Sequence, residues 1–307
     1  MEDRIFLESI KKVLTKGTVK SNELMKNHTS FGIGGPAKYY VQAADEKEIA
    51  AVLRLCHSEN VEILIVGNGS NLLVSDGGFD GLVLKPASDR IFVTQENGRL
   101  IVRADAGVLM SKLSMEVAGN AGSGFEFASG IPGSLGGGIF MNAGAYGGQM
   151  SDVFVSASVM GADGSVRVLH KDEMDFSYRH TVLLQTGEIV LSAELSFEMG
   201  NRDDILELIN GLTLRRREKQ PLEFKSAGSM FKRPAGFFAG KLIEDAGLKG
   251  YRVGDAQVSE KHAGFVINLG MATASDVKKL VDDVIGAVYA DSGIRLEPEV
   301  RFIGFNK

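Results

Sequence analysis

The 307-residue sequence lacks the features of several common protein classes. Its single cysteine, Cys56, excludes a disulfide within the chain and is expected in the core of a helix. Five histidines occur without HxxxH or HxH spacing, so no metal site is predicted. A net charge of -5 gives no basic surface for nucleic acid, and no signal-peptide core or membrane-length apolar run is present. These absences predict a cytoplasmic globular protein without disulfides or bound metal.

What the sequence does contain is a long run without charge. Residues 127–151, FASGIPGSLGGGIFMNAGAYGGQMS, hold no charged side chain in 25 positions, and eight of them are glycine. Glycine lets the main chain approach a ligand closely. Ile131 and Leu135 are too apolar for a flexible linker, and Pro132 and Asn142 interrupt the apolar length of a membrane span. Two interpretations stay open: a loop against a phosphate-bearing cofactor, or tight turns of an ordinary core.

A second loop rich in Gly, Asn and Ser follows a predicted strand, helix and strand. Residues 38–44 are typical of a strand, Asp45 and Glu48 resemble the capping box that begins a helix, and residues 61–66 are typical of a buried strand. This last strand runs into Gly67–Leu72. Ligands bind at the carboxyl ends of strands in α/β folds, so the loop is a candidate binding site.

Neither glycine-rich loop matches a nucleotide motif by spacing. Gly67-x-Gly69-x-x-Leu72 lacks the third glycine of a dinucleotide motif, and no GxxxxGK[ST] sequence occurs. A short helix predicted near Ser134 would add its positive end to backbone N–H groups that converge on phosphate. A cofactor loop is therefore favoured over a tight turn, although the residues alone leave both open.

The second half of the chain has a different pattern. Short strand patterns dominate residues 82–197, interrupted by one helical pattern at residues 108–119. One long helix is predicted to begin at residue 201 or 202, and another at Ser275. Two strong helices that flank short strands indicate a separate α+β domain, with a boundary near residue 200.

Three polar side chains could take part in catalysis, and each also has an ordinary explanation. Arg179 could bind a carboxylate or an oxyanion, or could pair with a nearby aspartate at the surface. Ser229 follows small residues and could donate a proton, or could lie in a simple turn. Glu299 lies in an alternating pattern that a solvated edge strand explains fully. Further groups that could bind a ligand are Lys219, Gln257 and Asn268.

In this order, the segments resemble the UDP-N-acetylenolpyruvoylglucosamine reductases, the MurB family. The matching segments are NHTSFGIGGP, GNGSNLLVSD, SGIPGSLGGG with NAGAYGG, FSYR, SAGSMFKRP, AGKLIEDAGLKG, VIN and LEPEVRF. They extend from about residue 27 to residue 303, almost the whole chain. The compact length, without an added loop in the C-terminal third, resembles the shorter subclass, which lacks a substrate-contacting tyrosine of the longer form.

The resemblance implies an α+β fold with two functional parts. An FAD-binding domain of the vanillyl-alcohol-oxidase (PCMH) type would occupy residues 1–200, in subdomains of about 1–85 and 86–200. A substrate-binding domain would follow at residues 201–298, and a strand at 299–307 would return to the FAD domain. The cofactor would be noncovalent FAD, since no histidine in the matching segments points to a covalent flavin link, and NADPH would be the co-substrate.

The resemblance also implies a reaction and its residues. NADPH would reduce UDP-N-acetylglucosamine enolpyruvate to UDP-N-acetylmuramate in peptidoglycan precursor synthesis, with hydride from flavin N5. By the family match, Ser229 donates the proton, Arg179 holds the carboxylate and enolate charge, and Glu299 assists protonation. The implied FAD contacts are Gly67, Asn68, Gly69, Ser70, Asn71, Leu72, Gly130, Ser134, Gly137, Gly138, Asn142 and Gly144. The implied substrate contacts are Tyr178, Lys219, Lys232, Arg233, Gln257 and Asn268.

Two other functions are compatible with parts of the sequence. A different flavoprotein of the same fold, such as an oxidase of small hydroxy acids, would use the first half alone, but the matching segments continue through the second half. A catalytically silent nucleotide-sugar binding protein would tolerate losses at catalytic positions, yet Arg179, Ser229 and Glu299 are all present. The reductase is therefore the favoured prediction.

Overall fold

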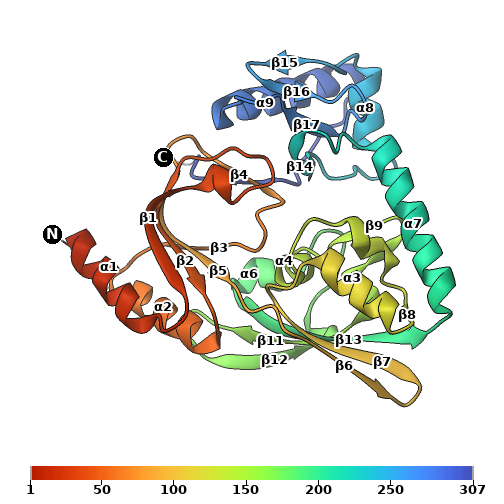
Figure 1. Ribbon diagram of the computed structural model, residues 1–307. Helices are drawn as coiled ribbons and strands as arrows, with labels where there is room; N and C mark the ends of the chain where they lie inside the picture. Colours follow the sequence, from red (N-terminus) through yellow and green to blue (C-terminus); the bar gives the residue numbers. More distant parts are fainter. Residues whose placement is uncertain (1, 306–307) are drawn as a thin grey trace. The chain divides into compact units, whose positions relative to one another are not determined.

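The computed structural model describes residues 2–305, which form two compact units (Figure 1). Of the described residues, unit 1 contains 2–21, 39–68 and 81–215, and unit 2 contains 22–38, 69–80 and 216–305. The domain limits expected from the sequence stay a prediction, because these units are defined by internal contacts and not by what each part binds.

The first sheet has the strand order β1-β2-β5-β3, with β3 and β5 parallel. The predicted strand, helix and strand are confirmed as β2, α2 and β3, although β5 lies between the two strands. Apolar side chains of α1, α2 and this sheet form one buried cluster that includes Phe6, Ile10, Val52 and Leu82. The elements are α1 (Glu2–Val13), β1 (Thr18–Leu24), β2 (Pro36–Ala43), α2 (Glu46–Ser58), β3 (Ile63–Ile65) and β5 (Phe79–Pro86).

Cys56 lies fully buried in this cluster, as the sequence predicted. Burial raises the pKa of its thiol to about 12, because the apolar surroundings disfavour the thiolate. A thiol that stays protonated near neutral pH is a poor nucleophile. Cys56 is therefore a packing residue.

The predicted capping box at the start of α2 is only half formed. Asp45 caps the helix, and its carboxylate accepts a hydrogen bond from Glu48 N at 3.1 Å. Glu48 does not return the bond to the N-cap amide; one of its carboxylate oxygens accepts from Thr15 N and Lys16 N, each at 2.7 Å. The other oxygen accepts from Ala44 N at 2.8 Å. Glu48, only 2% exposed, thus fixes the turn between α1 and β1 to the start of α2.

Acid should weaken unit 1 through Glu48. Burial alone would raise the pKa of this carboxyl, but backbone N–H groups outweigh it and lower the pKa from 4.5 to about 2. A depressed pKa stabilises the fold above pH 4.5 and loses that contribution as the pH falls toward 2. The shift corresponds to roughly 3 kcal/mol of unfolding free energy. Urea unfolding at pH 7 and pH 3 should show about two-thirds of this loss, roughly 2 kcal/mol, in the wild type and little of it in Glu48→Gln. The exposed neighbour Glu46→Gln is the control; if it changes the pH dependence as much, the assignment is wrong.

The second sheet of unit 1 is antiparallel, in the order β12-β11-β13-β7-β6, and β8 also pairs with β13. Figure 1 shows α3 and α4 on one side of this sheet, and α4 contacts β7 and β13. The helix predicted over residues 108–119 is confirmed as α3. Both helices contribute to a large buried cluster, which includes Leu113, Leu135 and Phe197. The strands are β6 (Ile91–Glu96), β7 (Arg99–Asp105), β8 (Gly122–Ser123), β11 (Phe154–Met160), β12 (Val166–His170) and β13 (Ile189–Met199).

Between these strands lie short elements that hold the charge-free run. The run contains the end of the 3₁₀ helix η2, helix α4 and the hairpin β9–β10, followed by α5. The helices and short strands between the long strands of this sheet are α3 (Met110–Gly119), η2 (Glu126–Gly130), α4 (Leu135–Phe140), β9 (Gly144–Ala145), β10 (Gly148–Gln149), α5 (Met150–Val153), η3 (Lys171–Glu173) and α6 (Leu183–Thr186).

Unit 2 is built on an antiparallel sheet in the order β14-β17-β16-β15. Helix α9 contacts β15, β16 and α8, and its face with Val277, Leu280 and Val284 is fully buried. A separate parallel pair joins β18 to β4. The two predicted long helices are confirmed as α7, which runs from unit 1 into unit 2, and α9. The elements are η1 (Met25–Asn27), β4 (Leu72–Val74), α7 (Arg202–Lys219), β14 (Lys225–Ser229), α8 (Ala239–Asp245), β15 (Arg252–Val253), β16 (Ala256–Val258), β17 (Phe265–Asn268), α9 (Ala274–Ser292) and β18 (Arg301–Ile303).

Candidate functional site

The two glycine-rich loops meet in unit 1. Asn68 Nδ2 donates a hydrogen bond to Pro132 O at 2.6 Å. A Cβ atom added to Gly67 would lie 2.2 Å from Ser134 Oγ, so no side chain fits at that position. The loop that follows β3 is thereby held against the residues at the start of α4. The close approach explains why glycine occupies position 67.

Helix α4 begins after Ser134, as predicted, but most of its first amides are already bonded. Leu135 N donates to Val108 O at 2.7 Å, and Gly136 N donates to Ala106 O at 2.9 Å. Within the described residues, Gly137 N has no protein acceptor. Of the N–H groups that were predicted to bind a phosphate at this helix, only that of Gly137 is available among the described residues.

Space at Gly137 contrasts with its two neighbours. A Cβ atom on Gly137 would meet only Ser134 Oγ, at 3.6 Å. On Gly136 it would lie 2.9 Å from Ala106 Cβ, and on Gly138 it would lie 2.9 Å from Met110 Sδ. Packing against Ala106 requires glycine at 136, and a Cβ at 138 would have to displace the buried Met110 side chain. Packing does not explain why residue 137 is glycine, and this is the position expected to face a ligand.

Asn142 supports the turn that carries Arg179. Its side chain is almost fully buried: Nδ2 donates to Ser177 O at 3.0 Å, and Oδ1 accepts from Ser151 N at 3.0 Å. The backbone at Asn142 has a φ of 43°, a left-handed conformation that asparagine tolerates better than most residues. The predicted cofactor residue Asn142 thus has a structural role that the sequence did not reveal.

Arg179 lies in a tight turn between Ser177 and His180, whose main chains exchange two hydrogen bonds of 3.2 Å. Its φ of 56° is unusual for a residue with a long side chain, and such strain is typical of functional sites. Arg179 Nη2 donates to Gly144 O at 3.2 Å, and the guanidinium carbon lies 5.0 Å from the centre of the exposed Tyr178 ring. The structure therefore brings together three predicted residues from the FSYR segment and the charge-free run.

The rest of the loop that begins at Gly67, residues 69–72, lies in unit 2. Gly69 has a φ of 64°, and an added Cβ would lie 1.9 Å from His28 O, so only glycine fits. Ser30 N donates to Gly69 O at 3.1 Å. Leu72 is buried in β4 and pairs with Arg301. The segment NHTSFGIGGP therefore packs against residues 69–72, with Ser70 in the middle of the loop.

Ser229 ends β14 immediately after a bulge. Ser226 pairs with Ile267 and Ser229 with Phe265, so β14 has one extra residue here. Gly228 absorbs it with a φ of 77°. Bulges re-aim side chains next to binding sites, and Ser229 is exposed as a result.

Glu299 lies beside this strand end. Glu299 N donates to Met230 O at 2.8 Å, and Asn71 Nδ2 donates to Glu299 O at 3.1 Å. Phe231 and Pro298 form an isolated bridge. The sequence pattern predicted an edge strand over residues 295–302, whereas the regular strand is only Arg301–Ile303. The unpredicted pairing with residues 230–232 holds Glu299 next to the end of β14.

The predicted substrate contacts differ in how many partners they already have. Asn268 is 5% exposed: Nδ2 donates to Phe31 O at 3.2 Å, and Oδ1 accepts from Gly270 N at 2.8 Å and Ala272 N at 3.1 Å. Its amide therefore braces the main chain. Gln257 Nε2 donates to Gly250 O at 3.2 Å. The remaining predicted contacts in unit 2 are Lys219 at the end of α7, Lys232 and Arg233.

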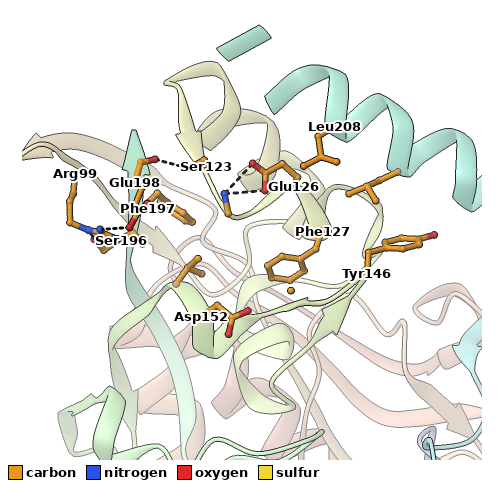
Figure 2. A pocket seen from close by; sticks show the side chains of 14 residues that line it. Arg99, Ser123, Glu126, Phe127, Tyr146, Asp152, Ser196, Phe197, Glu198 and Leu208 are labelled. Atoms are coloured by element: carbon orange, nitrogen blue, oxygen red, sulfur yellow. Dashed lines mark hydrogen bonds and ion pairs between the residues drawn. The ribbon is translucent and has the colours of Figure 1, made fainter. Parts of the chain in front are cut away.

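A hollow of about 440 Å³ in unit 1 contains none of the predicted site residues (Figure 2). Phe127 forms part of its wall, with the acidic side chains of Glu126 and Asp152 to either side, and Leu208 of α7 faces it. Three acidic residues line the hollow: Glu126, Asp152 and Glu198. Glu126 accepts hydrogen bonds from Gly124 N, and Asp152 accepts from the main chain and side chain of Gln149. The hollow is thus separate from the residues expected to bind FAD or substrate.

No helix within residues 2–305 is both long and apolar enough to cross a bilayer. An FAD-binding domain model matches residues 37–170, and the model of the UDP-N-acetylenolpyruvoylglucosamine reductase C-terminal domain matches residues 220–303. The protein is therefore an FAD-binding oxidoreductase of mixed α/β architecture.

Relatives that match nearly the whole chain identify the family more closely. The chain is 49% identical over 304 residues to the UDP-N-acetylenolpyruvoylglucosamine reductase of Lachnoclostridium phytofermentans, covering 98% of both chains. It is 46% identical to that of Clostridioides difficile, covering 95% of each. The crystal structure of MurB from Thermus caldophilus aligns with a TM-score of 0.79 and 35% identity, over 94% of this chain and 99% of that one. The chain belongs to the UDP-N-acetylenolpyruvoylglucosamine reductase (MurB) family, whose reductase reaction serves peptidoglycan precursor synthesis.

These findings confirm the expected family, the mixed fold with an FAD-binding domain, the enzyme class and FAD as cofactor. The roles of individual residues stay predictions. Sequence reasoning missed the hydrogen bonds by which Asn142 and Asn268 hold the main chain. The sequence alone does not show whether an asparagine amide is buried against the main chain or is available to a ligand. Sequence reasoning also missed the strained turn at Arg179, for which a lone arginine between tyrosine and histidine gives no signal.

Proposed function

We propose that this chain uses NADPH to reduce UDP-N-acetylglucosamine enolpyruvate to UDP-N-acetylmuramate in the cytoplasm. Family membership supports the overall reaction. One observation carries the catalytic assignment: the 2.8 Å hydrogen bond from Glu299 N to Met230 O, which aligns Glu299 with the end of the strand that presents Ser229. A proton donor and a carboxylate that assists it are thereby held on adjoining main chains.

FAD, when bound and reduced by NADPH, supplies a hydride to the CH₂ carbon of the enolpyruvyl group. The neighbouring carbon then holds an electron pair conjugated with the substrate carboxylate, and it needs a proton. Ser229 Oγ donates that proton, since the bulge at Gly228 exposes its hydroxyl. Glu299 assists through a hydrogen-bond network that restores the proton to Oγ. The guanidinium of Arg179 holds the carboxylate and the developing enolate charge.

The loops of unit 1 fit a phosphate-bearing cofactor. Among residues 2–305 the Gly137 amide has no protein acceptor, and open space lies where its side chain would be; Gly67 and Asn68 fix the second loop beside it. We assign the diphosphate to Gly137 N–H and to the neighbouring loop amides. Gly69–Leu72 continue that loop, while Gly130, Ser134, Gly138, Asn142 and Gly144 keep the wall in place.

The test is the substrate dependence of NADPH oxidation by the flavin-loaded protein. NADPH should be consumed only when the enolpyruvyl sugar nucleotide is present, and mass spectrometry should find a product heavier by two hydrogens. An oxidase of hydroxy acids would instead reduce its flavin with lactate or glycolate. That result, or no NADPH consumption with the enolpyruvyl substrate, would contradict the proposal.

A further inference from the structure

The loop after Ser229 presents two aromatic rings to solvent. Met230 and Phe231 are buried and fix the start of the loop against residues 297–299. Phe237 and Phe238, at the other end of the loop, are 48% and 63% exposed. Fully burying one phenylalanine side chain stabilises a fold substantially, so two adjacent exposed rings in a well-packed unit need another explanation.

The position of Phe238 in the local structure is also unusual. It is the N-cap residue of α8, with φ of -116° and ψ of 119°, and its side chain makes no capping hydrogen bond. Serine, threonine, aspartate and asparagine are strongly preferred there because their side chains bond the free amides of the first turn. Natural proteins depart from such local rules mainly at functional or strained sites, which makes Phe238 a candidate functional residue.

Arg233 lies next to the Phe238 ring. The guanidinium carbon of Arg233 is 4.5 Å from the centre of the Phe238 ring, a cation–π contact. Lys232, which precedes it, is held by Glu297 with Nζ and Oε2 3.3 Å apart. Nucleotides are bound by a similar combination, in which an aromatic face stacks with the base and a guanidinium contacts phosphate.

We propose that Phe238 and Arg233 form the subsite for the uracil base and the adjoining phosphate of the sugar nucleotide, an assignment that rests on the proposed function. The base stacks on the exposed surface of the Phe238 ring. Arg233, already in contact with the ring, donates to the phosphate. Phe237 supports the loop without touching the base, so the two neighbouring phenylalanines have different roles.

Binding of UDP to the flavin-loaded protein tests the subsite without turnover. Phe238→Ala should weaken UDP binding by about 5- to 150-fold, the equivalent of a stacking contribution of roughly 1–3 kcal/mol. Phe238→Tyr, which keeps an aromatic face, and Phe237→Ala, the matched control, should stay within about twofold of wild type. Pyrophosphate has no base, so its binding should not distinguish Phe238→Ala from wild type. Titration calorimetry and the saturation-transfer signal of the uracil protons would report these affinities.

Several results would overturn the subsite. They are wild-type UDP affinity in Phe238→Ala, equal losses in Phe237→Ala and Phe238→Ala, or no UDP binding by the wild-type protein. Slower flavin reduction by NADPH in Phe238→Ala alone would assign the ring to the other nucleotide and would also reject the proposal. A protein that binds UDP through Phe238 but does not reduce the enolpyruvyl sugar would keep the subsite and refute the proposed function, so the two failures are distinguishable.

Discussion

Ser229→Ala should reduce its flavin with NADPH at nearly the wild-type rate but reoxidise it with the enolpyruvyl sugar nucleotide about 10²- to 10⁴-fold more slowly, the usual contribution of a general acid. Only the second half-reaction requires a proton at the carbon beside the carboxylate. The hydroxyl of Ser229 is exposed at the end of β14, so its loss should not disturb the core of unit 2. Anaerobic stopped-flow absorbance of the flavin measures the two half-reactions separately.

Two variants control this experiment. Ser226→Ala removes a hydroxyl from the same strand, where the known contact is between the main-chain carbonyl of Ser226 and Ser30 Oγ, at 2.7 Å. It should leave both rates unchanged. Ser229→Cys keeps an acidic proton at the same position and should recover part of the reoxidation rate. Equal slowing of both half-reactions in Ser229→Ala would show that the residue supports structure or cofactor binding and is not the proton donor.

Gly137→Ala and the larger Gly137→Leu should purify with less flavin than wild type while the flavin-free protein stays folded. Outside the backbone of α4 itself, the nearest described atom to a Cβ at this position is Ser134 Oγ, at 3.6 Å, and alanine stabilises a helix interior by about 1 kcal/mol over glycine. The Cβ would instead occupy the space assigned to the diphosphate and block the approach to Gly137 N. We expect FAD affinity to fall at least about tenfold, or 1.4 kcal/mol, for alanine and further for leucine.

Gly138→Ala is the matched comparison, because its Cβ would lie 2.9 Å from Met110 Sδ in the core. That variant should lower the melting temperature of the flavin-free protein, whereas Gly137→Ala should not. Flavin content from absorbance and melting curves of both forms would give the comparison. Full FAD occupancy in Gly137→Leu would count against a main-chain diphosphate site at this helix.

Regular elements with a strong apolar period were predictable from the sequence. The helices α2, α7 and α9 carry apolar residues at helical spacing, and each forms at or within one residue of the predicted start. The buried strand predicted at residues 61–66 is shorter, at Ile63–Ile65, because the pairing with β5 covers only these residues. The parallel pairing of β4 with β18 joins segments far apart in the chain, and no local signal specifies it.

The candidate site was predictable only in part, because contacts between segments far apart in the chain leave no local signal in the sequence. Composition located the two glycine-rich loops, and a hydrogen bond from Asn68 to Pro132 joins them. Arg179, Ser229 and Glu299 were each ambiguous from their own surroundings, and the order of the matching segments singled them out. The bulge at Gly228 and the bond between Glu299 N and Met230 O depend on tertiary pairing, which no residue pattern shows.

The charge-free run gains a sharper interpretation from the structure. Its glycines serve two purposes: Gly136 and Gly138 allow α4 to pack on Ala106 and Met110, while Gly137 leaves an open position with an unused amide. Of the several free N–H groups expected for a phosphate, the described part of the chain leaves one at this helix, that of Gly137. The charge-free run is therefore packed against the protein at Gly136 and Gly138 and leaves space for a ligand at Gly137.

The most direct test of the central claim is an anaerobic two-step titration of the wild-type protein, followed by flavin absorbance. The purified protein should be yellow, lose its flavin absorbance when one equivalent of NADPH is added, and regain it when the enolpyruvyl UDP-sugar is added. Lactate or another small hydroxy acid should cause no bleaching. A protein whose flavin stays reduced in the presence of the enolpyruvyl substrate would contradict the account.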